Sequence, residues 1–145
     1  MIRVAEPGTA VHRVVGDAVP TDVSAEGLAI SPDGRLVATV NMRGTAFPPD
    51  SPRFQREASI TLLAFDPATG RLRKLADHPF EAALPEGGSF DAGGRHFLAT
   101  VFQYHDGAPG GGIEVFRVVD GGAPRLERLG RLPMPHGVHH VAIAR

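Results

Sequence analysis

The sequence predicts an all-β protein that forms part of a β-propeller, with about two complete four-stranded antiparallel blades and partial flanking blades. Three observations support this prediction. A strand–turn–strand unit at residues 26–41 recurs about 60 positions later, and each copy is followed by two more short apolar segments joined by a turn. Glycine and proline are abundant, at 18 and 13 of 145 residues. No segment shows a sustained helical period.

The first hairpin is defined by its turn. Leu28–Ile30 and Leu36–Val40 are short apolar runs that we expect to be strands, and Ser31-Pro32-Asp33-Gly34 separates them. Proline presets φ, aspartate bonds its own backbone, and glycine accepts a positive φ. The later strands of this unit are expected at 60–65 and 72–77.

The second copy begins at Glu86-Gly87 and turns at Asp91-Ala92-Gly93-Gly94. Its second strand is expected at 97–102 and its third at 112–118, and its fourth begins with the same Arg-Leu pair as the fourth strand of the first copy, at Arg125-Leu126. Four strands joined by turns in each repeat are typical of propeller blades.

These repeats divide the chain into four parts. Residues 1–25, with short apolar runs at 2–4 and 11–15, are expected to be the outer part of a preceding blade. Residues 26–85 are a blade with a long loop at 41–58, residues 86–135 are a second blade, and residues 136–145 are the first strand of a further one, with Val141–Ile143 as its apolar run. Propellers close with at least about four blades. We therefore expect the chain to need further blades in cis or self-association.

Composition excludes several classes of function. The formal net charge of −1 favours neither nucleic acid nor an anionic membrane as partner. The chain has no cysteine, which excludes disulfides and thiol chemistry. No run is long enough to span a membrane, and the first residues have no apolar core like that of a signal peptide, so the default expectation is a cytoplasmic location.

Three polar residues are expected around one end of the central channel. In an up-and-down blade, the loop that leads into the first strand and the loop between the second and third strands open on the same face. Glu26, Glu86 and His136 each precede a glycine at this position of three successive blades, and we predict them to be catalytic. The alternative is that they belong to turns that lead into strands and have solvated side chains.

The two long loops overhang the same end, which we call the channel mouth. They carry the predicted substrate-binding residues Asn41, Arg43, Gln103 and His105, and also Tyr104 and Asp106. Long loops in compact domains are often functional.

The His136-x-x-His139-His140 cluster has some resemblance to a metal site. His139 and His140 point to opposite faces of a strand, and no carboxylate lies nearby in sequence, so we predict no metal and no cofactor. No serine lies in a G-x-S-x-G elbow, which gives no support for a serine hydrolase.

Two turns carry a family resemblance. Residues 27–41 contain the turn Ser-Pro-Asp-Gly-Arg, and residues 60–72 contain Phe-Asp-Pro-Ala-Thr-Gly-Arg-Leu. Over residues 26–145 the chain resembles the lactonase-like, YVTN-type seven-bladed β-propellers, which include 6-phosphogluconolactonase-like proteins. The resemblance implies hydrolysis of a sugar-derived lactone at the channel mouth. The alternatives are a non-enzymatic propeller that binds a ligand or acts as a scaffold, and an inactive piece of a longer chain.

Overall fold

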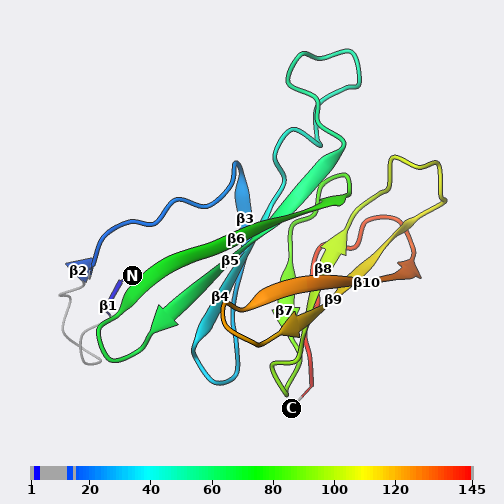
Figure 1. Cartoon of the computed structure of the whole chain (residues 1–145). Coiled ribbons are helices and arrows are strands. Elements are labelled where there is room, and N and C mark those ends of the chain that lie inside the picture. The colour runs from blue at the N-terminus through cyan, green and yellow to red at the C-terminus, as the bar shows by residue number, and fades with distance from the viewer. Residues whose placement is uncertain (1, 4–12, 15, 145) are drawn as a thin grey trace, which may run out of the picture.

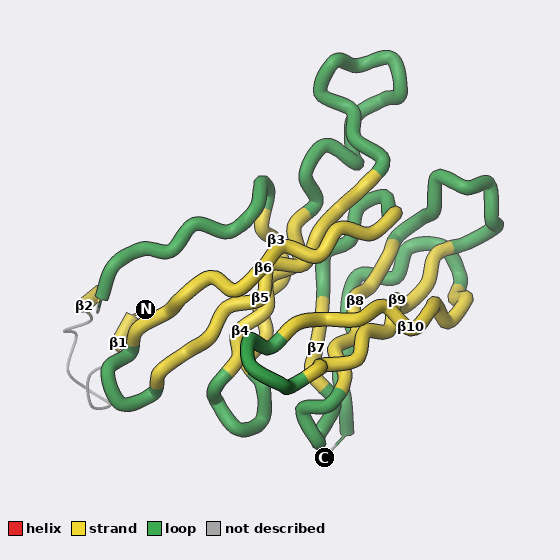
Figure 2. Tube along the Cα trace, viewed as in Figure 1, coloured by secondary structure: helices red, strands yellow, loops and turns green. Residues whose placement is uncertain are grey.

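The computed structural model describes residues 2–3, 13–14 and 16–144, and all regular secondary structure in this part of the chain is β-strand (Figure 2). The strands form three antiparallel sheets, two of which have four strands each. No helix in these residues is long and apolar enough to cross a membrane. The prediction of an all-β fold is confirmed.

The first four-stranded sheet follows the order of the sequence. Its strands are β3 (Ala25–Ile30), β4 (Leu36–Asn41), β5 (Glu57–Asp66) and β6 (Arg71–Glu81), and each pairs with the next. The second sheet repeats this arrangement with β7 (Gly88–Phe90), β8 (His96–Val101), β9 (Gly111–Val119) and β10 (Arg125–Met134). This up-and-down order is that of propeller blades, and Figure 1 shows the two blades beside each other.

Side-chain hydrogen bonds hold the first hairpin turn together. The Ser31 hydroxyl donates to Asp33 Oδ1 at 2.6 Å and accepts from the Leu36 amide at 2.9 Å. Asp33 Oδ1 also accepts from the Arg35 amide at 3.1 Å, and Gly34 has φ of 70°. These bonds lower the pKa of Asp33, with the Ser31 hydroxyl as the largest cause. The predicted turn chemistry is therefore what joins β3 to β4.

The second hairpin turn is also held together by side-chain hydrogen bonds, but these come from a single residue. Asp91 Oδ1 accepts from the backbone amides of Arg95 at 2.7 Å and His96 at 2.9 Å, and Gly94 has φ of 65°. Asp91 occupies the position of Ser31 in the first copy, so one aspartate performs the bonding that Ser31 and Asp33 share there.

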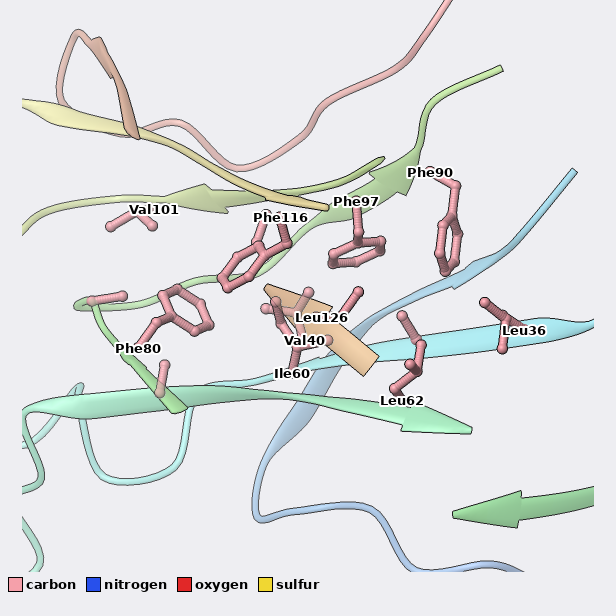
Figure 3. Close-up of a cluster of buried hydrophobic side chains, with 14 of the residues drawn as sticks. Leu36, Val40, Ile60, Leu62, Phe80, Phe90, Phe97, Val101, Phe116 and Leu126 are labelled. Atoms are coloured by element: carbon pink, nitrogen blue, oxygen red, sulfur yellow. The ribbon is translucent and has the colours of Figure 1, made fainter. Parts of the chain in front are cut away.

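One hydrophobic core lies between the two blades (Figure 3). Alternate residues of a strand share a face, so every second residue of β4 and of β8 points into it. Phe80 of β6 meets Phe116 of β9 edge-on, with ring centroids 5.6 Å apart. The main contributors are Leu36, Val40, Ile60, Leu62, Phe80, Phe90, Phe97, Val101, Phe116 and Leu126. The blades therefore pack face to face through aliphatic and aromatic side chains.

Strand β6 extends past the segment predicted for it. The sequence suggests an end near Asp77 because Pro79 follows, but pairing continues to Glu81 opposite Glu57. β6 is the edge strand of its sheet, where the missing proline amide interrupts no ladder of hydrogen bonds.

The two ends of the chain differ from the complete blades. Ile2–Arg3 (β1) and Arg13–Val14 (β2) form a separate antiparallel pair, and the rest of the strands predicted at 2–4 and 11–15 lies outside the described residues. The assignment of residues 1–25 to a preceding blade stays a prediction.

The strand predicted at Val141–Ile143 is not formed, and residues 138–144 have no regular secondary structure. The first strand of a blade pairs with the second strand of the same blade, and the described residues contain no such partner. The segment nevertheless lies beside the innermost strands, because Ile143 lines one cavity together with Ile30 of β3 and Phe90 of β7.

Candidate functional site

The long loops 42–56 and 102–110 extend from the same end of the two blades, the upper end in Figure 1, and the hairpin turns 31–35 and 91–95 lie at the opposite end. The backbone that leads into β3 and β7 reaches these strands from the end that carries the loops. As predicted, the two long loops and the segments that lead into β3 and β7 therefore lie at the same end of the blades (Figure 1).

A cavity of about 370 Å³ opens at this end beside the innermost strands. Its lining comes from the beginnings of β3 and β7 and from the segment after β10. We call it the mouth cavity, and its lining residues are Glu26, Gly27, Leu28, Glu86, Gly87, Gly88, His139 and His140. Two of the three predicted catalytic residues, Glu26 and Glu86, thus lie together, and His136 is not part of the lining.

Glu26 projects from an irregularity in its strand. The register between β3 and β4 shifts between Ala25, which pairs with Asn41, and Gly27, which pairs with Val40. Glu26 is therefore the extra residue of a β-bulge, a feature that redirects a side chain and occurs often beside active sites.

Backbone packing shows which residues are equivalent in successive blades. A Cβ placed on Gly27 would come within 2.6 Å of the Glu86 carbonyl oxygen and 3.2 Å of Gly87 Cα. A Cβ placed on Gly87 would come within 2.4 Å of the His139 carbonyl oxygen and 3.3 Å of His140 Cα. Residues 139–140 thus contact residues 86–87 in the same way as residues 86–87 contact residues 26–27. The structural counterpart of Glu26 and Glu86 is His139, three residues after the predicted His136.

His139 forms a close pair with Glu86. Its Nδ1 lies 2.6 Å from Glu86 Oε2, and both side chains remain partly open to solvent, at 53% and 37% relative exposure. An ionised carboxylate only accepts hydrogen bonds, so Nδ1 carries the hydrogen, and Nε2 has no hydrogen-bond partner among the described residues. A histidine oriented by a carboxylate, with its second nitrogen free, is suited to act as a general base.

His136 has a different environment. Its Nε2 donates to Gln103 Oε1 at 3.1 Å, and its ring packs on Phe102 with centroids 4.3 Å apart. Phe102 also contacts the ring of His139, at 5.3 Å. The predicted binding residue Gln103 therefore supports His136. A catalytic role for His136 stays a prediction, and the structure brings His139 to the mouth cavity in its place.

Asn41 lies inside the first blade. It is fully buried, and its amide nitrogen donates to Ser59 Oγ at 3.1 Å and Thr61 Oγ1 at 3.0 Å. Its oxygen accepts from the Thr39 hydroxyl at 2.9 Å, and Thr61 in turn donates to Asp77 at 2.6 Å. The Asn41 side chain therefore bonds to its own sheet, and it is not part of the lining of the mouth cavity.

Arg43 lies on the first long loop and is not part of the lining of the mouth cavity. Its Nε is 3.4 Å from Asp22 Oδ2, and its backbone has φ of 54°. It lines a separate cavity of about 430 Å³ with Gln55, Arg56, Glu57 and Glu81. Arg43 therefore connects the segment before β3 to the first long loop.

His105 joins the two long loops. Its carbonyl oxygen accepts from Arg56 Nη2 at 3.0 Å, and its ring meets Phe54 edge-on at 5.3 Å. Its Nε2 is buried without a hydrogen-bond partner among the described protein atoms. These contacts are structural and lie outside the lining of the mouth cavity.

Tyr104 and Asp106 stabilise the second long loop. Arg131 donates to Asp106 at 2.7 Å, and its guanidinium lies 4.2 Å from the centre of the Tyr104 ring. The backbone amide of Ala108 and then Arg131 lower the pKa of Asp106. Burial and then the Glu114 carboxylate raise the pKa of Tyr104, so the phenol stays neutral.

Among the described residues, no group of three or more His, Cys, Asp or Glu side chains is arranged to hold a metal ion. His136 and His139 both pack against Phe102, and each has its own polar partner, Gln103 and Glu86. In the structure, His136 and His139 are therefore two imidazoles that are hydrogen-bonded separately.

Two buried polar residues, Thr100 and Glu114, were not predicted from the sequence. Thr100 is fully buried and bonds the backbone on both sides of the Glu86–His139 pair. Glu114 is a fully buried acid on the face of β9 that carries the core residue Phe116. An acidic residue at a core-facing position was the available signal for Glu114, whereas the role of Thr100 depends on contacts between distant segments.

No family model matches the chain, and a comparison with curated proteins finds no match. Among solved structures, the chain is similar to the periplasmic gluconolactonase PpgL of Pseudomonas aeruginosa, with a TM-score of 0.54 and 24% sequence identity. The similarity covers 76% of this chain and 29% of that chain, so the chain spans less than a third of that protein's length. At this identity the similarity shows the fold alone. Together with the two four-stranded sheets, it identifies residues 25–134 as two blades of a β-propeller.

Proposed function

We propose that the chain is part of a lactonase-like β-propeller that hydrolyses a sugar-derived lactone at the channel mouth. The observation that carries the proposal is the 2.6 Å contact between Glu86 and His139 in an open cavity that also contains Glu26. The resemblance of the turns to lactonase-like propellers and the similarity to a gluconolactonase structure support the same class of reaction.

The proposed reaction uses His139 as the general base. Glu86 holds the Nδ1 hydrogen, and Nε2 takes a proton from a water molecule while the water oxygen attacks the lactone carbonyl carbon. The Glu86 carboxylate stabilises the imidazolium that forms. The acyl C–O bond of the ring then breaks, the proton passes from Nε2 to the leaving ring oxygen, and the product is the open-chain hydroxy acid. Glu26 accepts hydrogen bonds from the sugar hydroxyl groups.

The test is hydrolysis of glucono-1,5-lactone by the full chain, measured by acid release against the spontaneous rate in the same buffer. General acid–base catalysis contributes about 10²- to 10⁴-fold. We expect Glu86→Gln and His139→Ala to lower kcat by about 100-fold or more and His136→Ala to change it only a few-fold, because His136 lies outside the mouth cavity.

Wild-type rates in both Glu86→Gln and His139→Ala would contradict the proposed mechanism. Saturable binding of the lactone, with turnover equal to that of the buffer, would instead indicate a propeller that binds its ligand without hydrolysing it.

Further blades are proposed to complete the channel, in cis or from other copies of the chain. Leu132 and Met134 of β10 are 52% and 41% exposed, and they share a face because they are two positions apart. Leu28 and Ile30 of the innermost strand β3 are exposed as well. Apolar strand faces of this kind are normally covered by the neighbouring blade.

A further inference from the structure

The geometry of the Glu86–His139 pair depends on how two separate segments are held together. The residues lie 53 positions apart, Glu86 just before β7 and His139 after β10. Residues 138–144 have no strand partner, so no sheet ladder fixes the position of His139. Other contacts must therefore set the distance between the carboxylate and the imidazole.

Thr100 of β8 supplies such a contact on both sides of the pair. Its side-chain oxygen accepts a hydrogen bond from the Gly87 amide at 2.9 Å, directly after Glu86 in the chain. The same oxygen lies 3.1 Å from the carbonyl oxygen of His139 and 3.2 Å from that of Gly87. Thr100 is fully buried, so water does not compete for these bonds.

The single hydroxyl proton of Thr100 has a preferred acceptor. The Gly87 carbonyl already accepts from the Thr100 backbone amide at 2.9 Å, directly beside the Gly88–Ala99 pair of β7 and β8. No other bond to the His139 carbonyl is present among the described residues. The hydroxyl therefore donates to His139 while it accepts from Gly87, and one side chain connects the backbones that carry Glu86 and His139.

We propose that Thr100 is a positioning residue for the Glu86–His139 pair. Its hydroxyl sets the separation of the two segments, and the orientation of the His139 ring toward Glu86 follows from that separation. The inference rests on the proposed function for its catalytic consequence, but the positioning itself is measurable without turnover.

The first blade provides a matched control. Thr39 occupies the position of Thr100 in β4, and it is also buried. Its hydroxyl donates to Asn41 Oδ1 at 2.9 Å, so it bonds within its own strand and makes no contact with the mouth cavity. A Thr→Val exchange removes the hydroxyl at nearly constant volume, and at position 39 it reports the general effect of that loss.

The experiment measures the ring-nitrogen chemical shifts of His139 in the full chain by NMR, detected through the carbon-bound ring protons. We expect Thr100→Val to move the His139 shifts in the same direction as Glu86→Gln does. Thr100→Ser, which keeps the hydroxyl, and Thr39→Val are expected to leave them near the wild-type values. His78, which lies on β6 away from the pair, is the reference in the same spectra.

A folded Thr100→Val variant with wild-type His139 shifts would overturn the proposal. If that variant does not fold, the proposal is tested by NMR on the wild-type protein. The buried Thr100 hydroxyl proton should then show nuclear Overhauser contacts to the α-protons of His139 and His140, and their absence would overturn the proposal.

In the lactone assay, Thr100→Val is expected to lower kcat by about 10- to 100-fold with little change in KM, and Thr100→Ser is expected to restore it. Moved His139 shifts in a chain without any turnover would support the positioning role while contradicting the proposed function. Unchanged His139 shifts in Thr100→Val, in a chain that hydrolyses lactones, would support the proposed function and contradict the positioning role of Thr100.

Discussion

Arg128 donates from Nε and Nη2 to the two carboxylate oxygens of Glu114, at 2.6 and 2.9 Å. The Glu114 side chain is fully buried between the blades, whereas that of Arg128 is 48% exposed. The hydrogen bond to Glu114 raises the pKa of Arg128. An edge-strand cation therefore neutralises an acid that faces the core.

Removal of Arg128 should leave the buried Glu114 carboxylate without its counter-charge. We expect Arg128→Met to lower the free energy of unfolding by about 2–3 kcal/mol, less than for a fully buried pair because solvent screens the exposed guanidinium. Urea unfolding measures this change. The exposed pair Arg117–Glu127 on the same two strands is the control, and Arg117→Met should have a much smaller effect. Equal losses in the two variants would contradict the expectation.

Gly87 is expected to tolerate no side chain. A Cβ there would come within 2.4 Å of the His139 carbonyl oxygen, a backbone atom that can move only with its whole segment. Gly87→Ala should therefore lower the free energy of unfolding by about 1–3 kcal/mol and disturb the Glu86–His139 contact. In Gly93→Ala the nearest atom lies 3.4 Å away on the flexible Arg95 side chain, and stability should hardly change. Circular dichroism during heating compares the two, and a stable Gly87→Ala variant would show that the segments are less closely packed.

His78 should make stability depend on pH. Burial lowers its pKa, although Asp77 acts in the opposite direction, and its Nε2 accepts from the Leu126 amide of the second blade at 3.4 Å. Below the unfolded pKa of about 6.5, the unfolded chain takes up a proton that the folded chain resists. This contribution to stability is thus complete above about pH 6.5, is lost as pH falls below it, and levels off below the folded pKa.

The variant His78→Gln isolates this contribution, because a glutamine oxygen can accept from Leu126 but does not titrate. Urea unfolding between pH 7.5 and 5 should give a smaller decrease in stability for this variant than for the wild type. An unchanged slope would mean that other groups cause the pH dependence.

The exposed strand faces should make the isolated chain associate. We expect light scattering to give a mass above the 15.3 kDa of one chain, because apolar residues such as Leu132 remain uncovered in the monomer. Leu132→Lys should reduce association, whereas Ala68→Lys in an exposed turn should not. A monodisperse and cooperatively folding monomer would contradict the prediction that further blades are needed.

The blades could be predicted from sequence because their hairpin turns are local. Ser31, Asp33 and Gly34 bond and bend within a few residues of one another, and the same holds for Asp91 and Gly94. Alternation of apolar residues in the adjoining strands then indicates which face is buried. These features need no knowledge of distant contacts.

The candidate site could be predicted only in part, because it is assembled from distant segments. Glu26 and Glu86 follow from the repeat, in which each precedes a glycine, but the glycine after His136, Gly137, does not mark the equivalent position. The close backbone contact between Gly87 and His139 does, and it joins segments that lie 52 positions apart in the chain. Asn41 is similarly predicted to lie in the long loop 41–58, and only the pairing of β4 with β5 places it among buried hydroxyls.

Equivalent positions in the two blades and in the segment after β10 contribute Glu26, Glu86 and His139 to the mouth cavity. The hairpin turns within the blades lie at the other end of the strands (Figure 1). In the proposed site, ligand recognition and folding therefore depend on different residues of the same repeat. Duplication of a blade followed by a single exchange at its leading residue would alter the charge offered to a ligand and leave the folding determinants intact. Such an arrangement allows a propeller lineage to diversify its ligands one repeat at a time.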